Sequence, residues 1–372
     1  MADIETQIEN FVTRMTGRIS GAAVEFMAAC GVRLAKIGAL TAGQARDYLF
    51  SRKALEDQQN DLAKIKRILS AANKANLNDI DRLCGRIQAE VWDEAGSLLE
   101  RAGKEALPAG GPARPAAASP ILASVRNSYR ALADSTAASA VYREAVSGML
   151  SKMTGDEKRI NFRQAMRQTI RDLAGKGLYT VGYKSGLRRR LDTSVRSDLM
   201  SEFTRVVQGI EGEIAGEIGT DAWEISAHNH SAEDHEPLQG RVFANGEYEK
   251  LQNGMPAQDI DGRTFQISRP VGMWNCRHIA YPFMLGVSER AYPQERLDEI
   301  KEQNESGIVF RGKHYTLYEA EQMQRQIEAR MRRWRERKAV IQEVAGADPA
   351  FKMDLAAAKD RIKGLRAEYS IL

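Results

Sequence analysis

The chain has 372 residues, with 54 Lys and Arg against 50 Asp and Glu, and hydrophobic residues make up 43% of it. This composition excludes a globally disordered chain, and a net charge of +4 is too small to indicate nucleic-acid binding by itself. No apolar run reaches the roughly 18 residues of a membrane span, and the acidic start MADIETQIENF does not resemble a secretory signal. Three widely spaced cysteines cannot form a disulfide framework, so we expect a soluble chain of two or three folding units in a reducing cytoplasm.

The first region, 1–105, is predicted to be helical, because residues 4–104 contain no proline and repeat apolar residues at helical spacing. Four residues seven apart suggest a few heptads of coiled coil: Tyr48, Leu55, Leu62 and Leu69. Asparagine is a preferred residue at the N-cap of a helix, so we expect a second helix to begin at Asn78. A helical hairpin packed on its own chain and an oligomeric coiled coil both fit this pattern.

Residues 106–120, ALPAGGPARPAAASP, concentrate four prolines with Gly, Ala and Ser. Such a composition cannot bury enough surface to fold, so we predict a linker and place the main domain boundary here. In the next region, 121–218, helical periodicity predicts three helices, at 121–153, 161–174 and 192–218.

Between the last two of these helices, four glycines in GKGLYTVGYKSGLRRR predict that the chain turns. A basic cluster follows the glycines and could neutralise DNA phosphates without reading sequence: Lys184, Arg188, Arg189 and Arg190. A second basic cluster surrounds Trp334, but glutamates share its helix, which favours a solvated helix face.

The period changes to two residues from 222 to 268, where Trp223, Ile225 and Ala227 alternate with polar neighbours. Three turn pairs predict hairpins in a small antiparallel sheet: Asn245-Gly246, Asn253-Gly254 and Asp261-Gly262. We therefore predict a small α+β unit over 219–316 and C-terminal helices over 317–372, the last helix following Asp348-Pro349. The predicted fold class is mostly α, with long helices flanking a short antiparallel β insertion.

Four of the five histidines and one cysteine lie between residues 228 and 278. Imidazole and thiolate are good zinc ligands, and a hairpin could bring four candidates together: His228, His235, Cys276 and His278. Their spacing matches no standard zinc finger, and buried His and Cys residues often belong to a packed core. A structural zinc site and a metal-free core cluster therefore both remain open, and we expect no other cofactor.

Catalysis has little support in these residues. A nuclease of the His-Asn-His type needs its residues on a hairpin and a helix, whereas His228, Asn229 and His230 are consecutive. Asp234 and His235 are adjacent and would point to opposite faces of an extended segment. The chain also lacks a P-loop, a Rossmann glycine motif and a G-X-S-X-G elbow, so we assign no catalytic residue.

Four segments, in order and spacing, resemble the phage minor capsid protein 2 family, which is related to the Mu-F-like, portal-associated minor head proteins of tailed bacteriophages. They are GLYTVGYKSGLRRRLDTSVRSDLMSEF, DAWEISAHNHSAEDHEPLQGRVF, GMWNCRHIAYPFMLGVSERAY and YEAEQMQRQIEARMRRWRERKA, and the resemblance runs from about Ala140 to the end. The family's motif positions fall on Ser226, Ala227, His228, His235, Gln239, Gly240, Arg241, Phe243, Trp274, Asn275, Cys276, Arg277, His278 and Pro282. Many members carry an arginine between the two motif histidines, where this chain has Asn229 to Asp234.

The resemblance implies a non-enzymatic, structural minor head protein in the virion, inside the phage head and assembled in the host bacterial cytoplasm. Its expected partners are the portal protein, docked through helices of 121–218, and capsid or scaffold proteins, with nonspecific double-stranded DNA near the basic turn and no membrane. Two alternatives stay open: a metal-dependent hydrolase or nuclease using the His/Cys cluster, and a non-virion DNA-binding protein.

Overall fold

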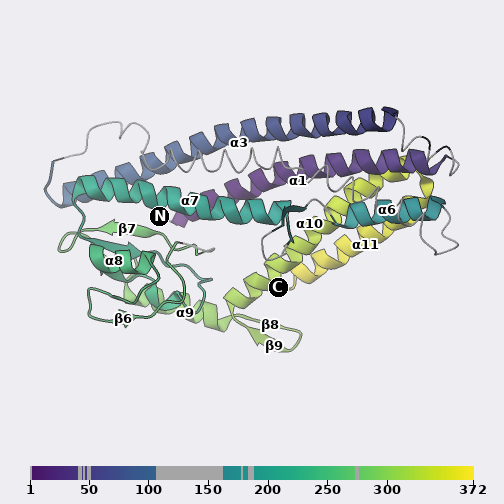
Figure 1. Ribbon diagram of the computed structural model, residues 1–372. Helices are drawn as coiled ribbons and strands as arrows, with labels where there is room; N and C mark the ends of the chain where they lie inside the picture. The colour runs from purple at the N-terminus through teal and green to yellow at the C-terminus, as the bar shows by residue number, and fades with distance from the viewer. Residues whose placement is uncertain are drawn as a thin grey trace.

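A computed structural model describes residues 2–40, 44, 47, 52–105, 162–176, 179–182, 188–272 and 276–372. Long helices dominate it, as Figure 1 shows, and the predicted mostly-α class is confirmed. The longest are α1 (Ala2–Gly38), α3 (Arg52–Arg101), α7 (Leu191–Ile218) and α10 (Leu317–Ala347), with shorter α6 (Phe162–Lys176) and α11 (Lys352–Tyr369). None of the described helices combines the length and apolar character needed to cross a membrane.

One hydrophobic core joins helices that are far apart in the chain. Helix α1 packs against α3, α6, α7 and α10, and each of these helices contributes buried apolar side chains to the same cluster. Two bidentate ion pairs add to this packing, from Arg167 of α6 to Asp348 and from Arg171 to Asp354 of α11. The core therefore draws on residues from both sides of the segment 106–120. That segment and the predicted helix 121–153 lie outside the described residues, so the domain division stays a prediction.

The course of helix α3 differs from the prediction at one helix boundary. It runs from Arg52 to Arg101 through Asn78, so the predicted helix start at that residue is wrong. Asn78 is exposed, and no proline or glycine interrupts the neighbouring turns, so its capping tendency does not outweigh the continuing helix. The side chains of Tyr48, Leu55, Leu62 and Leu69 lie outside the described residues, and so does the proposed heptad contact.

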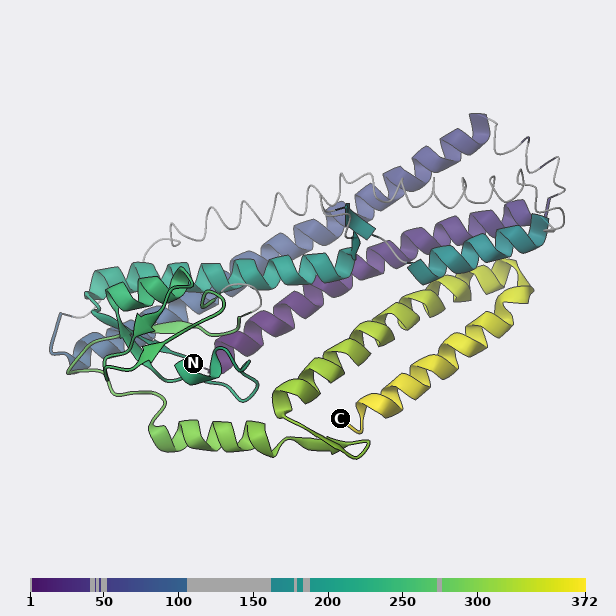
Figure 2. The same ribbon diagram turned by 60° about the horizontal axis from the view of Figure 1, so that its bottom comes forward.

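The α+β unit is built on a three-stranded antiparallel sheet. Its central strand β3 (Ala222–Ile225) pairs with β4 (Val242–Ala244) on one side and β7 (Ala280–Phe283) on the other. Around it lie η1 (Glu236–Leu238), α8 (Asn245–Gln252), the pair β5 (Ala257–Gln258) and β6 (Thr264–Phe265), α9 (Gln294–Ser306), and the hairpin β8 (Ile308–Phe310) and β9 (Lys313–Tyr315). Helix α7 covers β7, and Figure 2 shows the unit beside the N-terminal end of α1.

The expected alternation along β3 is wrong at Glu224, which is 4% exposed. Its carboxylate accepts hydrogen bonds from the backbone N–H groups of Ala291 at 3.0 Å and Tyr292 at 3.2 Å. Both faces of a central strand are covered here, so an inward polar residue is tolerated only because its oxygens are paired.

Two of the three predicted hairpin turns are also wrong. Asn245-Gly246 begins α8 and Asn253-Gly254 follows its end, whereas Asp261-Gly262 lies between the paired strands β5 and β6, as expected. Asn and Gly suit helix ends as well as hairpin turns, so the residue types do not distinguish the two. The glycine-rich segment does reverse direction, because β1 (Tyr179–Gly182) pairs antiparallel with β2 (Arg188–Arg190).

Candidate metal centre and the cavity beside it

Strand pairing brings the candidate ligands together. His228 and His235 follow β3, and Cys276 and His278 precede β7, its antiparallel neighbour. The pairing continues beyond the strands, since the Ser226 N–H donates to the Ile279 carbonyl at 2.8 Å and the Ile279 N–H donates to the Ser226 hydroxyl at 3.0 Å. Two segments about 50 residues apart in the chain therefore meet at one end of the sheet.

Three of the four candidates form a tight, buried group. The Cys276 Sγ lies 3.2 Å from His235 Nδ1 and 3.3 Å from His278 Nδ1, and one ligand atom from each residue lies within 4.8 Å of the others. These side chains are 0%, 5% and 2% exposed for His235, Cys276 and His278. A thiol and two imidazole nitrogens thus converge on one small volume.

Neighbouring groups orient the two imidazoles of this group. His235 Nε2 lies 3.0 Å from the carbonyl oxygen of Arg269, so the Nε2–H tautomer can donate there and present the Nδ1 lone pair to the sulfur. The Arg269 guanidinium pairs with Asp234 at 2.9 Å, and the Ser231 hydroxyl lies 3.4 Å from His278 Nε2. The roles of Ser231 and Arg269 were not foreseen, because nothing in their local sequence marks them.

Burial sets the protonation of the cluster. It lowers the pKa of His235 below its usual range and the pKa of His278 further, with positive charge nearby adding to the effect at His278. Burial also lowers the pKa of His228 to about 4 and raises the pKa of the Cys276 thiol. At neutral pH the imidazoles are therefore uncharged, with a lone pair available on each ring.

His228, the fourth candidate, contacts the group through its ring face. Its ring centroid lies 4.6 Å from that of His278, at 31° between the planes, and its nitrogens are not part of the group within 4.8 Å. Its backbone N–H donates to the Gln239 side chain at 2.7 Å. The position of His228 is therefore set by stacking and by a backbone hydrogen bond.

A polar cavity of about 590 Å³ lies beside the group. His228, Cys276 and His278 line it together with four arginines from several elements: Arg196, Arg269, Arg277 and Arg325. Acidic residues pair with these arginines, since Glu9 contacts Arg196 and Arg277, and Glu321 lies 2.8 Å from Arg325. The cavity is thus charged but largely internally neutralised.

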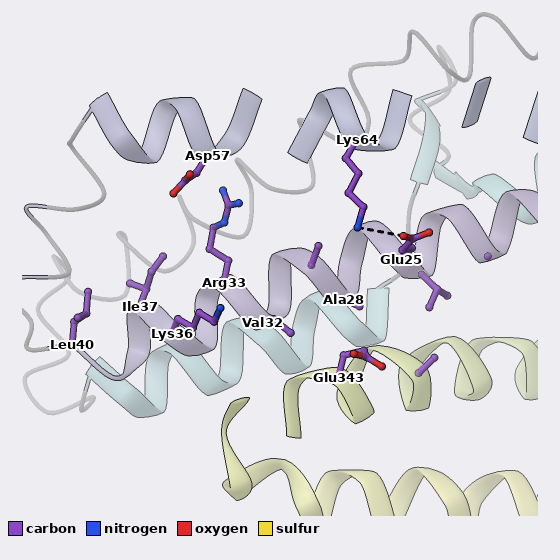
Figure 3. A pocket seen from close by; sticks show the side chains of 14 residues that line it. Glu25, Ala28, Val32, Arg33, Lys36, Ile37, Leu40, Asp57, Lys64 and Glu343 are labelled. Atoms are coloured by element: carbon purple, nitrogen blue, oxygen red, sulfur yellow. Dashed lines mark ion pairs between the residues drawn. The ribbon is translucent and has the colours of Figure 1, made fainter. Parts of the chain in front are cut away.

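A larger cavity of about 950 Å³ lies between α1, α3 and α10 (Figure 3). Apolar side chains such as Val24, Val32 and Ile37 line it, and an ion pair of 3.3 Å joins Glu25 to Lys64. Its described lining contains no histidine or cysteine, so it offers no comparable ligand set.

The predicted DNA-contact cluster is only partly described. The backbone of Arg188, Arg189 and Arg190 forms β2, but their side chains and all of Lys184 lie outside the described residues. In the second basic cluster, Arg330 lies 3.7 Å from Glu368, and the Arg337 guanidinium lies 4.8 Å from the Trp334 ring centroid. Glu368 belongs to α11 and Glu336 is buried, so this part of the cluster takes part in packing between α10 and α11 and is not the fully solvated helix face that we expected.

Several positions of the resemblance now have structural roles. Ser226 and Gln239 hydrogen-bond to the backbone around the cluster, and Pro282 lies opposite Trp223 in the sheet. Trp274 and Asn275 lie outside the described residues. The motif therefore holds the β3–β7 end of the sheet together.

The sequence model of the family described as phage minor capsid protein 2 matches residues 63–368. The match begins within α3, earlier than the resemblance that started near Ala140. Comparisons with curated proteins and with solved structures found no match. Because the family match covers most of its length, the chain belongs to the phage minor capsid protein 2 family.

Proposed function

We propose that this protein is a structural minor capsid protein of a tailed bacteriophage that docks against the portal inside the head. The observation that carries the proposal is the family match over residues 63–368. We assign it no catalytic role and propose that it occupies the virion after assembly in the host cytoplasm.

The fold supports a role in adhesion and stiffening. Helix α1 has 37 residues and extends about 55 Å, and its apolar face is buried along much of that length. A long helix anchored in one core resists bending, so its neighbours present fixed outer faces to other proteins. We propose that the 121–218 region, which includes α6 and α7, supplies the face that meets the portal, while other faces meet capsid or scaffold proteins.

The basic turn gives the proposal a DNA component. Lys184, Arg188, Arg189 and Arg190 would face packaged double-stranded DNA, where release of counterions favours contact without sequence recognition. Replacing all four with glutamine should weaken binding of the purified protein to duplex DNA and flatten its dependence on salt. The matched control replaces four arginines of α10 with glutamine: Arg330, Arg332, Arg333 and Arg335. Duplex DNA binding should change less in this control than in the variant of the basic turn.

Mass spectrometry of purified particles tests the main proposal. The chain should be present in mature heads in few copies, and chemical crosslinking of particles should join the 121–218 region to the portal protein. Absence from both mature heads and assembly precursors would contradict a structural role. Tight duplex binding without virion association would instead favour the non-virion DNA-binding alternative.

A second candidate, a metal-dependent hydrolase or nuclease, is favoured by one observation: the His/Cys group borders a cavity lined by arginines. Arginines beside a metal can bind a phosphate ester. A plasmid-nicking assay with zinc, manganese or magnesium tests it. Cleavage by the wild type that is lost in His278→Ala would support this candidate over the purely structural one.

A further inference from the structure

We propose that His235, Cys276 and His278 bind one zinc ion that cross-links the α+β unit, through His235 Nδ1, Cys276 Sγ and His278 Nδ1. The ion would join the segment before η1 to the segment before β7, about 40 residues further along the chain. This proposal concerns how the unit is stabilised, so it does not depend on portal docking.

The separations of the three atoms fit zinc. With Zn–N bonds of about 2.0–2.1 Å and a Zn–S bond of about 2.3 Å, ligand atoms of a tetrahedral site lie roughly 3.3–3.6 Å apart. The sulfur lies 3.2 and 3.3 Å from the two Nδ1 atoms, and the whole set falls within 4.8 Å. Both sulfur-to-nitrogen separations are thus within a few tenths of an ångström of the tetrahedral values.

The atoms around the group favour metal ligation. A zinc-bound histidine commonly donates its other ring N–H to a carbonyl or carboxylate, and His235 Nε2 faces the Arg269 carbonyl at 3.0 Å in this way. The backbone N–H groups of Gly272 and His278 hydrogen-bond to the Cys276 sulfur and help to fix its position between the two imidazoles. Both imidazoles are buried, so bulk water competes little with a metal ion for their lone pairs.

A fourth ligand would come from the cavity, since that is the space that two of the three ligand residues border. Cys276 and His278 are ligand residues that also line it, so a water molecule can reach the ion from that side. His228 lines the same cavity but stacks on His278, with its nitrogens outside the three-residue group. We therefore assign three protein ligands and exclude His228 from the set.

Metal analysis of the full-length protein, purified without chelator, tests the site. We expect about one zinc per chain, and after zinc is replaced by Co²⁺ we expect a sulfur-to-cobalt charge-transfer band. Cys276→Ser should remove the band, and His235→Ala should lower zinc affinity at least about tenfold. Two matched controls should keep both the band and the zinc: Cys84→Ser, at a buried cysteine of α3, and His228→Ala.

The outcomes separate zinc binding from a metal-free core cluster. A wild-type chain that takes up neither zinc nor Co²⁺ would overturn the proposal, as would a charge-transfer band that persists in Cys276→Ser. Loss of zinc in His228→Ala with retained folding would overturn the assigned ligand set. If the cysteine variant does not fold, the test uses wild-type protein from which metal has been removed with a chelator. Adding zinc to it should raise its thermal unfolding midpoint, and an unchanged midpoint would contradict the site.

Discussion

Glu211 is a carboxyl group buried where charge is costly. It lies in α7, is 3% exposed, and burial raises its pKa well above the usual range, with the nearby Glu94 carboxylate raising it further. A group whose pKa is raised on folding stabilises the folded state below its unfolded pKa, and that contribution is lost as the pH rises through the folded value. Ionisation of Glu211 should therefore lower the free energy of unfolding as the pH rises.

Glu211→Gln should relieve this cost. The amide carries no charge, so the variant should be more stable than the wild type at about pH 8, with the difference shrinking as the pH falls toward 4.5, the usual value for a glutamate. Urea unfolding at several pH values measures this. Glu217→Gln, at an exposed position of the same helix, is the control and should show little change. A Glu211→Gln variant that is less stable than the wild type at alkaline pH would contradict a raised pKa for Glu211.

Gly307 joins α9 to β8 in a backbone conformation that only glycine adopts readily, with φ 49° and ψ −145°. A Cβ there would lie 1.9 Å from the backbone oxygen of Tyr315, whereas Gly312, with φ 78°, has open space around it. Gly312→Ala should cost about 1 kcal/mol and Gly307→Ala more than about 2 kcal/mol. Thermal unfolding of both variants checks the order, and equal losses would show that the close contact is unimportant.

At the scale of elements, the contact between α1 and α10 depends on a small residue. A Cβ on Gly31 would lie 2.7 Å from the Cγ2 of Val344, a β-branched side chain with little freedom to move. Gly21, in the same helix, has nothing within 4 Å of such a Cβ.

Alanine at these two glycines should have opposite effects. Gly21→Ala should stabilise the protein by up to about 1 kcal/mol through helix propensity, whereas Gly31→Ala should destabilise it by about 1–3 kcal/mol through overpacking. Chemical denaturation gives both values. Adding Val344→Ala to Gly31→Ala should cost less than the sum of the single changes, and strict additivity would argue against the contact.

The elements that sequence analysis missed share a weak periodic signal. Helix α9 is polar on nearly every face, and its only buried side chains are Ile300 and Asn304, so it has no apolar stripe to detect. Strands β8 and β9 have three residues each, too few to show alternation. The long helices were predicted because apolar residues repeat in them at helical spacing, and many of the described ones lie in the buried core.

At the scale of the whole molecule, the N-terminal and C-terminal helices behave as parts of one body. Phe11 of α1, Leu83 of α3 and Val344 of α10 belong to the same buried cluster, although the 106–120 segment separates the first two from the third in sequence. A single core of this kind should unfold cooperatively.

After cleavage within 106–120, the two pieces of the chain should therefore stay bound to each other through the shared core. A full-length chain with a protease site inserted there should, after cleavage, still elute as one species in gel filtration, with only a modestly lower thermal midpoint. An uncleaved sample of the same protein is the control. Elution as two separate fragments would show that the regions on either side fold and act independently.

The helical class, the small antiparallel insertion and the residue types of the candidate site followed from local pattern, because helix periodicity and ligand chemistry are properties of short segments. The geometry of the site did not. The pairing of β3 with β7 brings the two segments to one end of the sheet. The tertiary structure there places His235 beside Cys276 and stacks His228 on His278, and both contacts join residues about 40 to 50 positions apart. Local periodicity carries no information about that packing, since the free energy that selects it comes from the assembled core.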